Sequence, residues 1–426
     1  MVSCMTTYNF DKITNRKGTN CLKYDFAVER GKPADVLPLW VADMDFPVSE
    51  EITKSLHAAV EHGIYGYTQP KDAYYNAVMN WMERKHNWKT KREWIVKTPG
   101  VVFALGAAVK AFTDPGDAIL IQNPVYYPFT NIIRDNDRKV VDNTLVYHSV
   151  TERTVVPVTT DDASEQQINN VGTVSPAYQI DFEDFDRKIE QEHVKLFILC
   201  NPHNPVGRVW TVEELQKLGE ICLRHHVIVV SDEIHNDFVY PGYEHTVFAN
   251  VDPRFAEFTL TCTAPSKTFN LAGLQISNIF IPNENLRKAF KTEIDRTGYD
   301  EPNALGVVAC EAAYRAGEDW LDQLKAYLLK NLNFLRDFLQ EKLPQIHLVE
   351  PEGTYLVWLD CSELGITGKE LDQFIVDKAG LWLDGGSMFG PSGAAFQRVN
   401  IACPQATLEL ALNKLKAAVE GYGNHL

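Results

Sequence analysis

The chain lacks the features of a membrane-spanning or disulfide-stapled protein. None of its 426 residues falls in a run that approaches 18 consecutive apolar residues, so no transmembrane helix is predicted. The first residues, Met1–Thr6, contain no apolar core of signal-peptide length, and we expect no signal peptide. Eight scattered cysteines form no C-x-x-C pair, and several lie in apolar runs, which indicates reduced core thiols. These absences predict a cytoplasmic protein.

The chain also lacks an excess of basic charge. Its formal net charge is −16, which argues against nucleic acid or an anionic membrane as the main partner. No metal site is predicted. What is present is a hydrophobic fraction of 45%, ordinary for a globular protein, and enough length for two domains or one large domain with an appendage.

Short apolar runs alternate with helical patterns through the middle of the chain. Strand candidates lie at 118–121, 196–199, 227–230, 259–262 and 276–281, and a helical pattern lies at 212–225. Most of these strands are nearly continuous apolar runs, which is typical of parallel strands buried on both faces. The pattern predicts an α/β domain with a mainly parallel sheet built from βαβ crossovers.

The two ends of the chain differ from this middle part. Helical periodicity covers 49–62 and 71–86, and a long amphipathic helix is expected over 318–342. A strand at 355–359 and a closing helix at 407–422 follow. We therefore predict a large domain over 46–316, and a smaller α+β domain formed by 1–45 and 317–426. Residues 147–178 include a polar stretch without periodicity, 158–167, and are predicted to form an exposed insertion loop.

Three polar residues follow apolar runs at separate points of the chain. Lys267 follows the run 258–262, Asp232 ends the run 228–232, and Asn204 follows the run 196–200. Taken singly, each has an ordinary explanation: a solvated loop lysine, a helix-capping aspartate and a turn asparagine before proline. Together they suggest pyridoxal phosphate (PLP), which needs a lysine for its Schiff base and an acid for its pyridinium nitrogen.

Three further features fit such a site more weakly. Pro99-Gly100 opens a helical pattern at Val101 and Val102, whose amides could bind phosphate, although any helix start looks similar. Tyr126 could stack on a flat ring or pack in the core. Arg398 could bind a substrate carboxylate or lie on the surface.

The ordered set of Tyr126, Asn204-Pro205-Val206-Gly207, Asp232, Ser266-Lys267 and Arg398 resembles the class I/II aminotransferase superfamily of PLP fold type I. Further runs resemble its MalY/PatB branch of cystathionine β-lyases and cysteine-S-conjugate β-lyases. These runs are 37–46 (LPLWVADMDF), 65–67 (YGY), 201–210 (NPHNPVGRVW), 231–235 (SDEIH), 264–274 (APSKTFNLAGL) and 400–404 (NIACP). The resemblance covers nearly the whole chain.

The resemblance implies a role for each matching residue. Lys267 would hold PLP and then act as the base at Cα, Asp232 would pair with the ring nitrogen, and Arg398 would bind the substrate carboxylate. The other implied cofactor contacts are the ring oxygen for Asn204, ring stacking for Tyr126, phosphate for Val101, Val102 and Ser266, and phosphate of the neighbouring subunit's cofactor for Tyr67, which would require a homodimer. His235 stands where many aminotransferases carry tyrosine, and we include it among the cofactor-binding residues. Gln275 stands where many carry a phosphate-binding arginine.

The predicted reaction is β-elimination of a thiol from a sulfur-containing L-amino acid, giving pyruvate and ammonia. The first alternative is an aminotransferase, which would use the same Lys267, Asp232 and Arg398. A minor alternative is a PLP-binding regulatory protein that acts through protein contacts.

Overall fold

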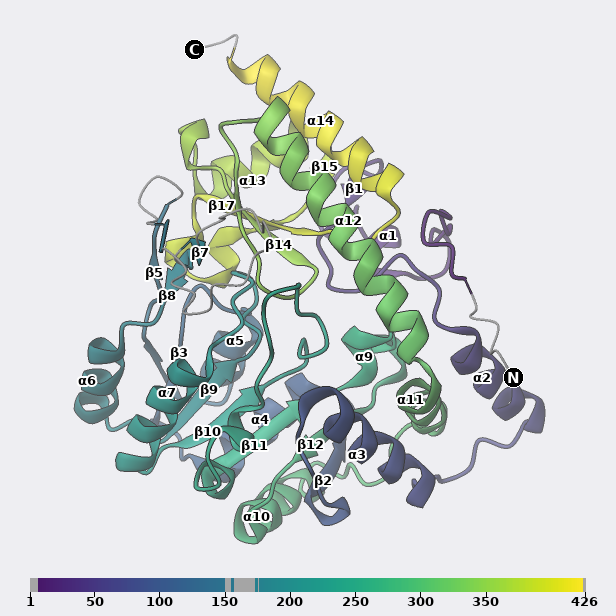
Figure 1. Ribbon diagram of the computed structural model, residues 1–426, viewed down its shortest axis with the longest axis vertical. Helices are drawn as coiled ribbons and strands as arrows, with labels where there is room; N and C mark the ends of the chain where they lie inside the picture. The colour runs from purple at the N-terminus through teal and green to yellow at the C-terminus, as the bar shows by residue number, and fades with distance from the viewer. Residues whose placement is uncertain (1–6, 150–154, 157–172, 175, 424–426) are drawn as a thin grey trace, which may run out of the picture.

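The computed structural model describes residues 7–149, 155–156, 173–174 and 176–423. Its main feature is a seven-stranded sheet (Figure 1). In spatial order the strands are β2 (Ile95–Thr98), β12 (Ser277–Phe280), β11 (Thr259–Thr263), β10 (Ile228–Asp232), β9 (Leu196–Cys200), β3 (Ala118–Ile121) and β4 (Lys139–Asp142). The five strands from β11 to β4 are parallel. The predicted α/β fold is confirmed.

Strand β12 is the antiparallel member of this mainly parallel sheet. It lies within the predicted strand 276–281 and pairs antiparallel with both β11 and β2. All four of its residues are buried. Burial on both faces carries no information on the direction of a strand, so the sequence gives no prediction for this one.

Helices cover both faces of the large sheet. One face packs against α4 (Val101–Phe112), α5 (Pro128–Asp135) and α10 (Glu284–Asp295). The other packs against α6 (Phe182–Glu192) and α7 (Val212–Arg224). Within β3, Ile119 and Ile121 belong to the first of these cores and Leu120 to the second. This double burial is the physical reason why the strands read as unbroken apolar runs.

A second sheet lies beyond the long helix α12 (Glu318–Lys342), which crosses much of the molecule in Figure 1 and lies beside α14 (Gln405–Gly423). Its four strands are antiparallel, in the order β13 (His347–Val349), β14 (Leu356–Asp360), β17 (Phe396–Asn400) and β16 (Asp384–Gly385). The N-terminal strand β1 (Leu37–Pro38) pairs with β15 (Leu381–Trp382). The chain's two ends thus meet, as expected for the smaller domain, although the boundaries at 46 and 316 stay a prediction.

The expected helices near the ends form at α2 (Glu50–His62) and α3 (Asp72–His86), and the expected α12 has the predicted bounds. The helices that the structure describes include none long and apolar enough to cross a membrane. The insertion predicted at 147–178 begins and ends in an antiparallel pair, β5 (Val146–Tyr147) with β8 (Tyr178–Gln179). Its polar stretch, 158–167, lies outside the described residues.

Candidate active site

The predicted site residues converge on one edge of the large sheet. Asp232 ends β10 and lies in register with Cys200 of β9 and Cys262 of β11. Because these strands are parallel, the loops that follow them leave from the same edge, where open α/β sheets bind their ligands. One of these loops carries Asn204, and another leads into the short helix α9 (Pro265–Thr268), which carries Lys267.

A cavity of about 180 Å³ lies at this edge. Eight of the ten predicted site residues line it: Val101, Val102, Tyr126, Asn204, Asp232, His235, Ser266 and Lys267. The other lining residues are Ala42, Pro99, Gly100, Cys200, Ile234, Ala272, Gln275 and Ile276. Ala42 was absent from the prediction, because an alanine in an irregular N-terminal run gives no chemical signal.

Lys267 is partly buried on the cavity wall, and its Nζ donates a hydrogen bond to the carbonyl of Ala42 at 2.6 Å. Desolvation lowers the pKa of this amine to about 8. The nearby charges act in both directions: Asp43 and Asp232 raise the pKa, whereas Arg398 lowers it. In the described part of the chain, no carboxylate oxygen lies within 4.0 Å of this amine. The solvated-loop explanation of Lys267 is therefore wrong.

Asp232 is almost fully buried and faces the same cavity. Desolvation raises the pKa of its carboxyl to about 7, against the lowering effects of the Ile234 amide and of Lys267. The Ile234 amide donates to it at 3.2 Å. A buried acid with only a local backbone partner has capacity left for a cationic ligand atom.

Arg398 does not line this cavity, but it contacts a residue that does. Its Nη1 donates to Oδ1 of Asn204 at 2.8 Å, and its Nη2 donates to the carbonyl of Trp40 at 3.1 Å. Nη2 also forms an ion pair with Asp384. The guanidinium lies over the ring of Phe389, with its carbon 4.8 Å from the ring centroid. Arg398 is 3% exposed, so the surface explanation is wrong.

Asp384 is a partner that the sequence reasoning missed. It lies on β16 directly across from Arg398 of β17, and burial raises the pKa of its carboxyl while Arg398 lowers it. A signal was available, because Asp384 ends the apolar run Leu381-Trp382-Leu383, just as Asp232 ends its own strand.

His235 and Tyr67 occupy contrasting environments. His235 is buried, and desolvation, followed by the charges of Lys267 and Arg398, lowers its pKa, which favours the neutral ring. No hydrogen-bond partner for its Nδ1 occurs among the described residues. Tyr67 is 95% exposed and does not line the cavity. Its predicted contact with a neighbouring subunit stays a prediction.

The cavity fits PLP on the chemistry of its lining. It offers an amine, a buried acid without an ion-pair partner in the described chain, and the first amides of α4, which begins at Val101. The first turn of a helix leaves its amides without intrahelical acceptors, so they can bind a phosphate group. A larger cavity of about 540 Å³ is lined by 85–86, 236–241, 243–245, 321–322, 325–326, 328–329 and Thr354, and none of the ten predicted residues contributes to it.

Comparison with known proteins agrees with this geometry. Residues 34–415 match the model of the family "Aminotransferase class I and II". The chain belongs to this family. It is 44% identical to cystathionine β-lyase PatB of Bacillus subtilis over 411 residues, covering 96% of this chain and all of PatB. It is 30% identical to protein MalY of Escherichia coli, covering 97% of this chain and 99% of MalY.

Solved structures give the same result. Cystalysin from Treponema denticola, which contains a pyridoxal 5'-phosphate cofactor, superposes with a TM-score of 0.89 at 36% identity over 98% of this chain and all of cystalysin. The PLP-bound C-S lyase from Staphylococcus hominis gives 0.85 at 34% identity over 97% of this chain and 98% of that one. These matches confirm fold type I, PLP as the cofactor, and membership of the PatB/MalY branch of PLP-dependent carbon–sulfur lyases.

Proposed function

We propose that the chain catalyses β-elimination of a thiol from a cysteine S-conjugate, and that Lys267 and Asp232 are its central residues. The observation that carries this proposal is their shared cavity, which is lined by a partly buried amine, without a carboxylate partner among the described residues, and by a buried acid. Similarity to PatB, a cystathionine β-lyase, and to the C-S lyase supports elimination over transamination. When bound, PLP supplies an electron sink for the negative charge that develops at Cα.

The other predicted site residues are proposed to hold the cofactor and the substrate. Asp232 pairs with the ring nitrogen, and Asn204 donates its amide to the ring oxygen while its own oxygen accepts from Arg398. The other cofactor contacts are the amides of Val101 and Val102 and the hydroxyl of Ser266 for the phosphate, the ring of Tyr126 for stacking, and neutral His235 beside the ring.

Arg398 is proposed to bind the substrate α-carboxylate. A guanidinium binds a carboxylate through two parallel hydrogen bonds. One nitrogen is held by Asn204, and the other is shared between Asp384 and the Trp40 carbonyl. This arrangement fixes the plane of the guanidinium, and the substrate carboxylate must compete with Asp384 for Nη2.

The proton moves through Lys267. As a neutral amine it accepts the proton from Cα; the Cβ–S bond then breaks, and the sulfur leaves with the bonding electrons and takes up a proton. The released 2-aminoacrylate reacts with water to give pyruvate and ammonia. With a pKa of about 8, a fraction of the Lys267 amines is neutral near pH 7. An ordinary lysine is almost entirely protonated at that pH.

We also propose a cytoplasmic homodimer. Seven cysteines are described, all are unpaired, and six of them are buried, which suits a reducing compartment. Apolar and aromatic side chains are exposed together next to α2 and Tyr67, with Ile64 72% and Tyr65 60% exposed. Such a group suits burial against a second copy. Sedimentation of the PLP-loaded protein tests the state, and a monomer would contradict it.

A steady-state assay tests the activity. The purified protein is loaded with PLP and given L-cystathionine without any keto acid. We expect equal amounts of pyruvate and free thiol; a cofactor absorption band without pyruvate would move the assignment to transamination or to another conjugate. Cystine, cysteine and bulkier S-conjugates, assayed in parallel, rank the substrates.

A further inference from the structure

The segment 40–46, of sequence WVADMDF, crosses the cavity wall and brings its backbone to both proposed functional cations. The carbonyl of Ala42 accepts from Lys267 Nζ at 2.6 Å, and the carbonyl of Trp40 accepts from Arg398 Nη2 at 3.1 Å. Two residues of one short segment thus contact the amine proposed to move the proton and the guanidinium proposed to bind the substrate.

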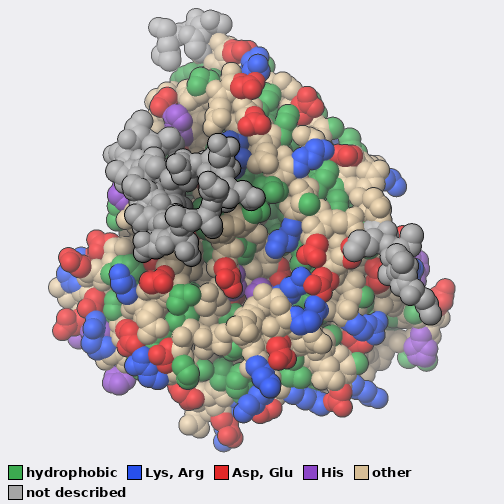
Figure 2. Space-filling model, viewed as in Figure 1, with side chains coloured by type: hydrophobic (Ala, Val, Ile, Leu, Met, Phe, Trp, Pro, Cys, Tyr) green, Lys and Arg blue, Asp and Glu red, His purple; other side chains and the backbone are tan. Residues whose placement is uncertain are grey.

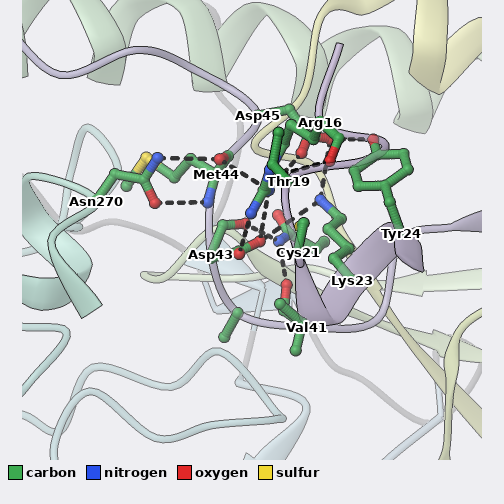
Figure 3. Close-up of polar contacts among 12 residues, drawn as sticks. Arg16, Thr19, Cys21, Lys23, Tyr24, Val41, Asp43, Met44, Asp45 and Asn270 are labelled. Atoms are coloured by element: carbon green, nitrogen blue, oxygen red, sulfur yellow. Dashed lines mark hydrogen bonds and ion pairs between the residues drawn. The ribbon is translucent and has the colours of Figure 1, made fainter. Parts of the chain in front are cut away.

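Two asparagine side chains fix this backbone. Asn400 Nδ2 donates to the carbonyls of Val41 and Asp43, on either side of Ala42, at 2.6 Å each. Asn270 accepts from the Met44 amide at 3.0 Å and donates to the Met44 carbonyl at 3.0 Å (Figure 3). It also donates to the Phe46 carbonyl at 2.9 Å. Every carbonyl from residue 40 to residue 44 therefore accepts a side-chain hydrogen bond.

The positions of the two asparagines link this segment to the site. Asn270 comes three residues after Lys267 and has φ of +57°, in the left-handed region that asparagine tolerates better than most residues. Asn400 comes two residues after Arg398 on β17. Each asparagine thus ties the segment to the short stretch of chain that carries one of the two cations.

The opposite side of the segment is held by charge. Arg16 binds Asp43 at 2.6 Å and Asp45 at 2.8 Å, and Asp45 also accepts from Lys23 at 3.0 Å and from the Tyr24 hydroxyl at 2.9 Å (Figure 3). Both carboxylates of the segment are thereby fixed. The backbone between the asparagines and these charges has little freedom to move.

We propose that Asn270 and Asn400 are positioning residues of the lyase, which hold the Ala42 carbonyl as the acceptor that orients the Lys267 amine whenever that amine is not bonded to the cofactor. This inference rests on the proposed role of Lys267. Misplacement of a reacting group by about 1 Å can cost on the order of 100-fold in rate, so a fixed acceptor for the free amine has a direct kinetic effect.

The test uses cofactor-free protein, so that its result does not depend on lyase activity. Asn270→Gly removes the amide side chain and keeps the left-handed backbone accessible. Asn87→Gly is the matched control, because Asn87 also has a positive φ, of +47°, is exposed, and lies at the end of α3. Asn400→Ser is a second, independent variant on another element, in case Asn270→Gly folds poorly.

Two readouts are expected to change together. Hydrogen exchange of the peptide covering 40–48 accelerates in Asn270→Gly and Asn400→Ser, and stays as in wild type in Asn87→Gly. Acylation of Lys267 by acetic anhydride at pH 7, measured by mass spectrometry relative to the exposed Lys54, rises about threefold or more, because a charged amine that loses its acceptor gives up its proton more readily. Faster exchange with unchanged acylation would overturn the proposal, as would unchanged exchange in both variants.

The PLP-loaded variants complete the test. We expect kcat for pyruvate release to fall about tenfold in both asparagine variants, and KM to change less, since the amine acts after the substrate is bound. An unchanged kcat alongside altered acylation would also overturn the role. If wild type itself releases no pyruvate, the proposed function fails, while the exchange and acylation results still decide whether the segment positions the amine.

Discussion

Two lysines, Lys23 and Lys267, lie close to the segment 40–46, and they differ in their polar partners. Lys23 is fully buried, and its Nζ lies 3.0 Å from Asp45 and 3.9 Å from Asp43. Lys267 lines the cavity, and among the described residues its amine donates to a neutral carbonyl and to no carboxylate. A carboxylate partner keeps a buried lysine charged and structural, whereas a carbonyl leaves it able to lose its proton.

The same contrast separates two buried aspartates. Asp45 accepts from Arg16, Lys23 and Tyr24, so its charge is fully used within the protein. Among the described residues, the side chain of Asp232 accepts only from the amide of Ile234, and burial raises its pKa. The segment 40–46 contributes to both places, since Asp43 and Asp45 belong to the ion cluster and Ala42 lines the cavity. Unused polar capacity, rather than burial, marks the site that awaits a ligand.

The largest expected effect comes from Lys267→Ala. We expect the rate of pyruvate release to fall by at least about 10³-fold, because both the attachment of the cofactor and the base at Cα are removed. The melting temperature should not fall, since no ion pair is lost. The assay is pyruvate release on L-cystathionine, with circular dichroism as the folding control. Substantial residual lyase activity would contradict the role of Lys267.

Lys23→Met should lower the stability of the fold, whereas Lys267→Ala lowers the activity. Removing one partner of a buried ion pair costs about 3 kcal/mol of unfolding free energy, because the charge of Asp45 loses a partner that water cannot replace. Urea denaturation measures this loss. The double variant Lys23→Met/Asp45→Leu should recover part of it; a double variant no more stable than the single one would show that the pair is not the source.

The sequence located most of the cavity because its residues follow recognisable strands. Asp232, Asn204 and Lys267 come at or after the ends of apolar runs, and parallel strands bring such ends together at one edge. The antiparallel direction of β12 was not predicted, because burial on both faces carries no directional signal. The bounds of α12 were right, since its amphipathic period is long and unbroken.

The parts that escaped prediction depend on contacts across long separations. Ala42 reaches Lys267 across 225 residues, and Asn204 reaches Arg398 across 194. No local pattern marks an alanine carbonyl as an acceptor or shows that Asp384 faces Arg398 on the neighbouring strand. No local pattern marks Lys23 as buried, because its partners Asp43 and Asp45 lie 20 or more residues away. Acidic and basic side chains are indeed interspersed over the face shown in Figure 2.

A pH series measures directly how the cavity changes the titration of the Lys267 amine. In cofactor-free protein we expect acylation of Lys267 to rise with pH through a midpoint of about 8, because only the neutral amine reacts and desolvation lowers its pKa. The exposed Lys54 is the reference lysine for the same reagent. Mass spectrometry of the two labelled peptides from one sample provides both curves. Equal midpoints would mean that the cavity does not perturb the amine.

The smallest expected effect sharpens the contrast between the two aspartates. Asp232 must be ionised to pair with a protonated ring nitrogen, and its pKa is raised to about 7 by burial. The carboxylate is therefore present above pH 7 and is lost as the pH falls, so PLP affinity should weaken by up to about tenfold per pH unit below 7.

Asp232→Asn, titrated alongside, should bind PLP more weakly and lack this dependence, which separates the aspartate from groups on the cofactor that titrate in the same range. Because Asp45 contacts Arg16, Lys23 and Tyr24 and does not line the cavity, Asp45→Asn should destabilise the fold while leaving the slope of PLP affinity with pH as in wild type. A wild-type slope in Asp232→Asn would instead remove Asp232 from the proposed pairing.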